Sequence, residues 1–309
     1  IEKLYSYFGV KDDFEMGIKL GSTCRWVMPE KFHYWTNPEC PMFDVLKGKK
    51  RTSLSEPGIF AETEDVAEVE KFPWPEIKYV DFSETLREID RTVEAGQAVL
   101  SGAWSCFYHN VSDFFGMENY FMKMHTDREV VDAVTRHVVD FYLEANEILF
   151  NAAGNKIDAF FFGNDFGSQL DLLISPEHFD HFVMPYFREF TDQAHRHGYN
   201  VVLHSCGSID RVIPRLIDAG VEVLHPIQAM AKNMDAESLA KKYNGKIVFL
   251  GGVDTQRLLP FGKPDEVRRE VRRLKDLFGP NFLVSPSHES ILPNVSPENI
   301  SAMAETAVE

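Results

Sequence analysis

Short apolar runs alternate with amphipathic helical patterns through most of this chain, from about Gln97 to its last residues. After each run, apolar residues recur at steps of three and four, which is the period of a helix with one buried face. Such an alternation predicts parallel strands that are joined by helical crossovers. The predicted strands are Ala98–Ala103, Ala159–Phe162, Val201–His204, Val221–Leu224, Ile247–Leu250 and Phe282–Val284.

Two architectures suit a chain of this kind: a (β/α)8 TIM barrel and an open doubly wound sheet. No Gly-x-Gly-x-x-Gly fingerprint follows the first predicted strand, which disfavours a dinucleotide-binding open sheet. Polar residues instead follow nearly every predicted strand, as they do where a barrel builds its active site from several loops. We therefore predict an α/β fold of the (β/α)8 TIM-barrel type.

The N-terminal third of the chain has a different character. Proline interrupts residues 1–95 six times, and three tryptophans lie among these prolines. We expect residues 1–95 to form an irregular N-terminal cap or lid that includes a helix over residues 82–94. Residues 96–309 would form the barrel core, so that residues 1–309 make a single domain.

Charge and cysteine content limit the classes of partner and compartment. The formal net charge is -16 at pH 7 and the pI is about 5.1, so the average surface repels nucleic acid and anionic membranes. We find no apolar segment long enough to span a bilayer and no signal peptide. The four cysteines form no Cys-x-x-Cys pair, which predicts a reduced, cytoplasmic protein. Cys24, Cys40 and Cys106 are expected to be small core residues.

The strand that ends at His204 carries the most specific chemical signal. A strand has a period of two residues, so His204 and Cys206 are expected to point to the same side. An imidazole and a thiol at this spacing suit half of a zinc site. The alternative is a core histidine that is hydrogen-bonded to the backbone, next to a buried thiol.

Other polar residues follow the remaining strands and would share one rim of a barrel. His288 or Glu289 would supply the third protein ligand of a zinc ion, which leaves a fourth position open for water or substrate. Asp165 is expected to act as a ligand, as a base, as a substrate-positioning group or as a capping residue. For Asp254, a purely structural role as an N-cap or in an Asx-turn is a strong alternative. The candidate substrate-binding residues are Trp104, Asn164, Gln169, Gln228 and Asp254.

Several motifs together resemble the uroporphyrinogen decarboxylase superfamily, and the resemblance covers residues 95–309. The segments that carry it are His204 to Ser208, Leu216 to Val221, Gly251 to Gln256, Ile291 to Ile300, and the Gly163 to Gln169 loop that precedes Ser175 to Glu177. The resemblance implies a (β/α)8 barrel, in agreement with the alternation of strands and helices.

The superfamily has a decarboxylase branch and a branch of zinc-dependent methyltransferases that work with corrinoid proteins. His204 and Cys206 match the His-x-Cys ligands of the methyltransferases, and His288 or Glu289 stands near the place of their later cysteine, which this chain lacks. The resemblance therefore implies zinc and a corrinoid carried by a partner protein. It implies transfer of a methyl group from a small, methylated substrate, such as a methoxy-aromatic compound in an O-demethylase. Asp165 and Glu289 would be catalytic, and a homodimer is one option for the assembly.

Two alternative functions stay open at this point. A uroporphyrinogen decarboxylase of haem biosynthesis would need no metal, but the arginine-containing RQAGR motif of that branch is missing here. A barrel that binds a tetrapyrrole or corrinoid without turnover is the second alternative.

Overall fold

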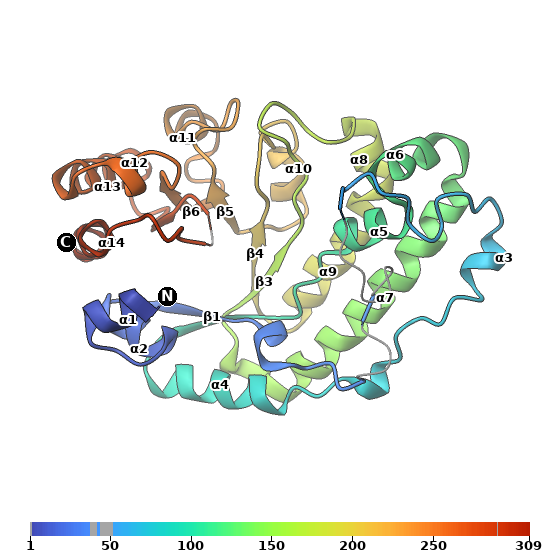
Figure 1. Ribbon diagram of the computed structural model, residues 1–309, viewed down its shortest axis with the longest axis horizontal. Coiled ribbons are helices and arrows are strands. Elements are labelled where there is room, and N and C mark those ends of the chain that lie inside the picture. The colour runs from blue at the N-terminus through green and yellow to red at the C-terminus, as the bar shows by residue number, and fades with distance from the viewer. Residues whose placement is uncertain (1, 38–41, 44–51, 289) are drawn as a thin grey trace.

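A computed structural model describes residues 2–37, 42–43, 52–288 and 290–309, so Cys40 and Glu289 lie outside the described residues (Figure 1). Its centre is one seven-stranded sheet in which every neighbouring pair is parallel and the strand order follows the chain. The strands are β1 (Cys24–Val27), β2 (Ala98–Ser101), β3 (Ala159–Gly163), β4 (Asn200–His204), β5 (Val223–Ile227), β6 (Val248–Val253) and β7 (Phe282–Pro286).

Helices connect the strands and line the outside of the curved sheet (Figure 1). The helices are α1 (Glu2–Phe8), α2 (Asp13–Lys19), α3 (Val66–Val69), α4 (Ser83–Glu94), α5 (Phe107–Phe115), α6 (Met117–Thr126), α7 (Arg128–Ala153), α8 (Pro176–Phe182), α9 (Met184–Arg196), α10 (Ile213–Asp218), α11 (Ala236–Tyr243), α12 (Leu258–Phe261), α13 (Pro264–Phe278) and α14 (Pro297–Val308), with 3₁₀ turns η1 (Pro29–Phe32), η2 (Ile77–Tyr79) and η3 (Gly154–Lys156). None of the helices in the described part of the chain is long and apolar enough to cross a membrane.

The predicted alternation of strands and helices is confirmed, because all six predicted strands are present as β2 to β7. The sheet also contains β1, whose residues pair with Ala98–Ser101 although they lie in the segment expected to be a cap. The sequence does not predict β1, because this strand is only four residues long and shows no clear apolar period before Pro29. The β5 strand begins at Val223 and runs two residues past His225, so it lies further along the chain than its apolar run predicts.

Local signals in the sequence set the start of α8 and the end of α7. Ser175 accepts the backbone N–H of His178 and Pro176 takes the first turn of α8, as the Ser-Pro-Glu motif predicts. The long helix α7 ends at Gly154, whose φ of 57° is a backbone conformation that glycine adopts at little cost.

Alternate residues of β3 face two different layers of packing. Phe160 and Phe162 stack on each other with ring centroids 4.6 Å apart and point toward the helices, where Phe162 meets Phe187 and Phe190 of α9. Phe161 points to the concave side, where it packs with residues of the neighbouring strands. This inner cluster contains Ala159, Phe161 and Val202, with Trp26, Leu100, Trp104 and Val223 packed against it.

We expect Phe162→Ala to destabilise the protein by about 3–5 kcal/mol, because it removes a fully buried ring and leaves a cavity between β3 and α9. Urea denaturation followed by circular dichroism measures this loss. The matched control is Phe261→Ala, since the Phe261 side chain is 77% exposed and its removal should change the free energy of unfolding by less than about 0.5 kcal/mol. Equal effects of the two substitutions would contradict this account of the core.

Candidate metal centre

Three potential metal ligands meet where β3 and β4 end. Asp165 follows β3, His204 is the last residue of β4, and Cys206 lies two residues further on. Nε2 of His204 is 3.4 Å from Sγ of Cys206 and 3.4 Å from Oδ1 of Asp165. One ligand atom from each of the three side chains lies within 4.8 Å of the other two. Among the described residues, these three form the cluster of potential ligands that could hold a metal ion.

The spacing of these atoms suits a tetrahedral zinc ion. Zinc bonds of about 2.0–2.1 Å to nitrogen, about 2.0–2.2 Å to carboxylate oxygen and about 2.3 Å to sulfur imply ligand atoms roughly 3.3–3.6 Å apart in a tetrahedron. The two distances from His204 Nε2 fall in that range. The donor set of carboxylate, imidazole and thiolate is also one that zinc accepts, and three protein ligands leave a fourth position open.

A second histidine orients the first. Nδ1 of His204 lies 3.0 Å from Nδ1 of His225, and both rings are buried. Burial, together with the nearby His204 and His288, lowers the pKa of His225 well below its ordinary value, so this ring is neutral at pH 7. A neutral His225 can accept the Nδ1 proton of His204, so that Nε2 of His204, which faces Asp165 and Cys206, can bind a metal in place of its own proton. Metal-bound histidines are held by this kind of outer hydrogen bond.

The Asp165 carboxyl is ionised at neutral pH. Burial by itself would raise the pKa of Asp165, but the hydrogen bond and charge of His204, together with the backbone N–H of Cys206, lower it to about 2. That N–H donates to Oδ1 of Asp165 over 2.7 Å. His109 lies on the other side, with Nε2 3.9 Å from Oδ2, and burial lowers the pKa of His109.

Two glycines allow the β3 and β4 loops to approach each other. A Cβ on Gly207 would collide with the carbonyl oxygen of Gly167, and a Cβ on Gly167 would lie 2.7 Å from the backbone nitrogen of Ser208. Gly207 also has a φ of 87° and donates its N–H to Oε1 of Gln228 over 2.7 Å. Close backbone contact at this point keeps Asp165 beside Cys206.

Aromatic rings form the wall next to His204. The ring centroid of Trp104 lies 5.4 Å from that of His204 and 4.9 Å from that of Trp26, and Phe161 completes the group. Gly163 makes room for Trp104, because any Cβ at Gly163 would overlap the indole ring. Half-buried Glu30 accepts the backbone N–H of Trp104 at 2.9 Å, and desolvation raises the pKa of Glu30 to about 7.

The structure brings together some of the residues predicted from the sequence and separates others. Asn164 is fully buried and both atoms of its amide bond to backbone groups, and Gln169 is exposed. Asp254 accepts three backbone N–H groups in the turn before α12, whose N-cap residue is Arg257, so Asp254 matches the Asx-turn alternative and not the N-cap. His288 lies outside the group of three ligands, and its Nδ1 accepts the backbone N–H of Ser290 at 3.1 Å. Glu289 is not among the described residues.

The fold brings two further residues to this region that the sequence does not predict, His109 and Glu30. His109 lies in α5, within a helix whose pattern indicates only packing. Glu30 follows β1, so recognition of that strand would have placed Glu30 on the rim of the sheet with the other residues that follow strands.

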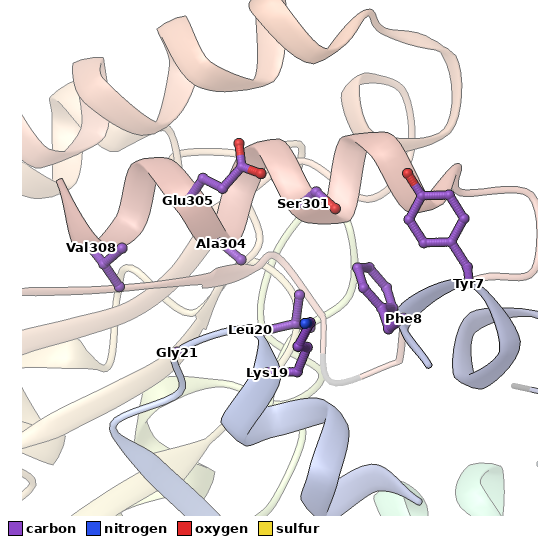
Figure 2. Close-up of a pocket in the computed structure, with 9 residues that line it drawn as sticks. All are labelled: Tyr7, Phe8, Lys19, Leu20, Gly21, Ser301, Ala304, Glu305 and Val308. Carbon is purple, nitrogen blue, oxygen red and sulfur yellow. The ribbon is translucent and has the colours of Figure 1, made fainter. Parts of the chain in front are cut away.

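A separate groove lies between the two N-terminal helices and α14, and Figure 2 shows its lining. Its volume is about 430 Å³. The lining residues are Tyr7, Phe8, Lys19, Leu20, Gly21, Ser301, Ala304, Glu305 and Val308. They share no member with the ligand group, so this groove is distinct from the candidate metal centre.

Comparison with known proteins agrees with this α/β architecture. The family model described as uroporphyrinogen decarboxylase (URO-D) matches residues 47–309. A solved structure, a methyltransferase from Methanosarcina mazei, is similar in fold, with a TM-score of 0.57 and 20% sequence identity. The match covers 73% of this chain and 62% of that protein, which is less than two thirds of its length. No curated protein matches the sequence.

The matched region takes in most of the chain, including every ligand of the candidate centre. The chain therefore belongs to the uroporphyrinogen decarboxylase family.

We predict that Gly207→Ala is about 1–3 kcal/mol more destabilising than Gly198→Ala. Both glycines have a φ near +80°, but a Cβ on Gly198 meets nothing within 4 Å, so the control carries the backbone strain without the collision. Thermal and urea denaturation of the two variants measure the difference. If both variants lose the same stability, the contact between Gly207 and Gly167 does not constrain the site.

The raised pKa of Glu30 makes stability depend on pH. The folded protein holds the Glu30 proton more tightly than the unfolded chain, in which Glu has its usual pKa of 4.5. Protonated Glu30 therefore stabilises the fold fully below pH 4.5. This stabilisation is lost as the pH rises to about 7. Glu30→Gln keeps an acceptor for the Trp104 N–H. We expect this variant to gain up to about 3 kcal/mol over the wild type between pH 5 and pH 8 in urea titrations. A pH-independent difference would contradict the prediction.

Proposed function

We propose that this protein is a zinc-dependent methyltransferase that moves a methyl group from a small methylated substrate to a corrinoid protein. One observation carries the proposal: Asp165, His204 and Cys206 meet at the ends of β3 and β4 with the spacing of a tetrahedral zinc site. Carboxylate, imidazole and thiolate ligands that leave one position open are typical of catalytic rather than structural zinc.

Each of these residues has a definite task in the proposed centre. Asp165, His204 and Cys206 hold the ion, and His225 fixes the orientation of His204. A bound zinc ion supplies Lewis acidity to a heteroatom of the substrate. Glu289 would supply the proton that the leaving group takes up, because Asp165 is ionised and serves as a ligand.

The proposed reaction breaks the bond between the methyl carbon and a substrate oxygen. A corrinoid carried by the partner protein would accept the methyl group and would provide the electron pair of the new bond. The oxygen leaves as an alkoxide or phenolate and is then protonated. For a methoxy-aromatic substrate, the aromatic group of Trp26, Trp104 and Phe161 supplies a surface on which the substrate ring can stack. Gln169 and Gln228 stay our candidates for polar contacts with the substrate.

We further propose that the sheet closes into a (β/α)8 barrel. The two edge strands β1 and β7 both line one groove of about 480 Å³, which also contains inward-facing Trp26, Phe161 and His225. Several residues of these edge strands are only half buried, whereas β3 is buried throughout. An eighth strand between β1 and β7 would pair with both edges and cover the inner cluster.

The family name supports a second candidate, decarboxylation of uroporphyrinogen. That reaction requires no metal, so the two candidates predict different behaviour of the same residues. For the decarboxylase, His204 and Cys206 would bind no ion, and the purified protein would consume uroporphyrinogen.

Zinc analysis of the purified protein tests the proposed function. We expect about one equivalent of zinc per chain in the wild type and little in His204→Ala, Cys206→Ala and Asp165→Ala. His195→Ala and Cys24→Ala are the matched controls, because His195 pairs with Glu222 near a helix end and Cys24 lies in β1. Both controls should retain zinc.

Activity then separates the candidates. Loss of methyl transfer to a free or protein-bound corrinoid in the zinc-deficient variants supports the methyltransferase. A zinc-free wild type that decarboxylates uroporphyrinogen would overturn the proposal. Failure of both assays would favour a barrel that binds its ligand without turnover.

A further inference from the structure

Hydrogen bonds tie α5 to the loop that carries Asp165, and none of them uses the ligand atoms of the proposed metal centre. Nε2 of His109 accepts the backbone N–H of Asp165 at 2.9 Å. In the opposite direction, the backbone N–H of Tyr108 donates to Oδ1 of Asn164 at 2.9 Å. Nδ2 of Asn164 also donates to the carbonyl oxygen of Ser105, just before α5, at 3.1 Å. Tyr108 and His109 of α5 are thus hydrogen-bonded to Asn164 and Asp165 of the loop after β3, and we call this pair of contacts the clamp.

The clamp is anchored in the core on both sides. Asn164 is fully buried and donates its own N–H to the carbonyl oxygen of His204 at 2.9 Å. On the other segment, Asn146 of α7 accepts the backbone N–H of Ala103 at 2.8 Å and donates to Oγ of Ser105 at 3.1 Å. Buried polar groups that are fully paired in this way hold a backbone in one conformation.

His109 acts on Asp165 at the peptide from which the carboxylate projects. One carboxylate oxygen, Oδ1, faces His204 and accepts the N–H of Cys206, while Oδ2 lies 3.9 Å from His109 Nε2. Rotation of the peptide plane before Asp165 would break the His109 contact and change the direction of its side chain. His109 thus opposes the motion that would move Asp165 away from His204 and Cys206.

We propose that His109 is a positioning residue for the metal centre, which sets the direction of the Asp165 ligand by accepting its backbone N–H. This inference rests on the proposed function, because it assigns to His109 an effect on the affinity and ligand field of the bound ion. It also requires the tautomer of His109 that has its proton on Nδ1, since Nε2 is the acceptor.

Metal binding to His109→Phe and His109→Gln tests the inference. The phenyl ring fills the space but accepts no hydrogen bond, so we expect about 10–100-fold weaker zinc binding in competition with a chelator. The glutamine amide can accept the N–H, so His109→Gln should regain most of the loss. His181→Phe is the control, because His181 lies on α8 beside Asp132 and its replacement should leave zinc affinity unchanged.

The absorption spectrum of the cobalt(II)-substituted protein separates a change at Asp165 from general damage. We expect His109→Phe to keep the thiolate-to-cobalt charge-transfer band, because Cys206 still binds, and to shift the ligand-field bands. The Asp165→Asn variant should shift those bands in the same way. A wild-type protein that binds neither zinc nor cobalt would overturn the proposed function. If the wild type and His109→Phe bind zinc with equal affinity and have identical cobalt spectra, only the role of His109 is overturned.

Nitrogen NMR of the histidine rings tests the geometry without any metal and without a folded His109→Phe variant. Wild-type protein labelled at histidine should show His109 in the tautomer with its proton on Nδ1, and the Asp165 amide should exchange slowly with solvent. A proton on Nε2 of His109 would overturn the inference, because that nitrogen could not then accept the hydrogen bond.

Discussion

The parallel register of β3 and β4 is the constraint on which the site depends. The two strands pair along their whole length, from Ala159 with Asn200 to Gly163 with His204. One further bond, from the N–H of Asn164 to the carbonyl oxygen of His204, extends the pairing past the end of β3. The next residue on the β3 side is Asp165, so the sheet delivers a carboxylate beside an imidazole and a thiol.

The surroundings of these ligands favour the protonation states that a metal requires. Asp165 is a carboxylate at neutral pH, and burial keeps His225 neutral, so that it can accept the proton of His204 Nδ1. Next to this polar group, Trp104 packs against Trp26 and Phe161 and provides an apolar wall. The centre is thus polar where it can hold an ion and apolar where a substrate can stack.

Family and chemistry contribute different parts of the functional argument. Membership of the uroporphyrinogen decarboxylase family accounts for the α/β architecture, and a fold by itself does not define a reaction. The donor set is what distinguishes the two candidate reactions, because a cofactor-free decarboxylation gives no reason to gather Asp165, His204 and Cys206 at 3.4 Å contacts. We therefore base the proposed function on these three residues.

The sequence by itself determined the alternation of strands and helices and the common direction of His204 and Cys206, because both depend on periods of a few residues. It also gave Asp165 as one of several open possibilities for a ligand. Only the tertiary structure decided that Asp165 joins His204 and Cys206, that β1 belongs to the sheet, and that His109 and Glu30 lie beside the site. The reason is range: the contact of His109 with Asp165 joins residues 56 positions apart, and no local pattern encodes which distant loops a sheet register brings together.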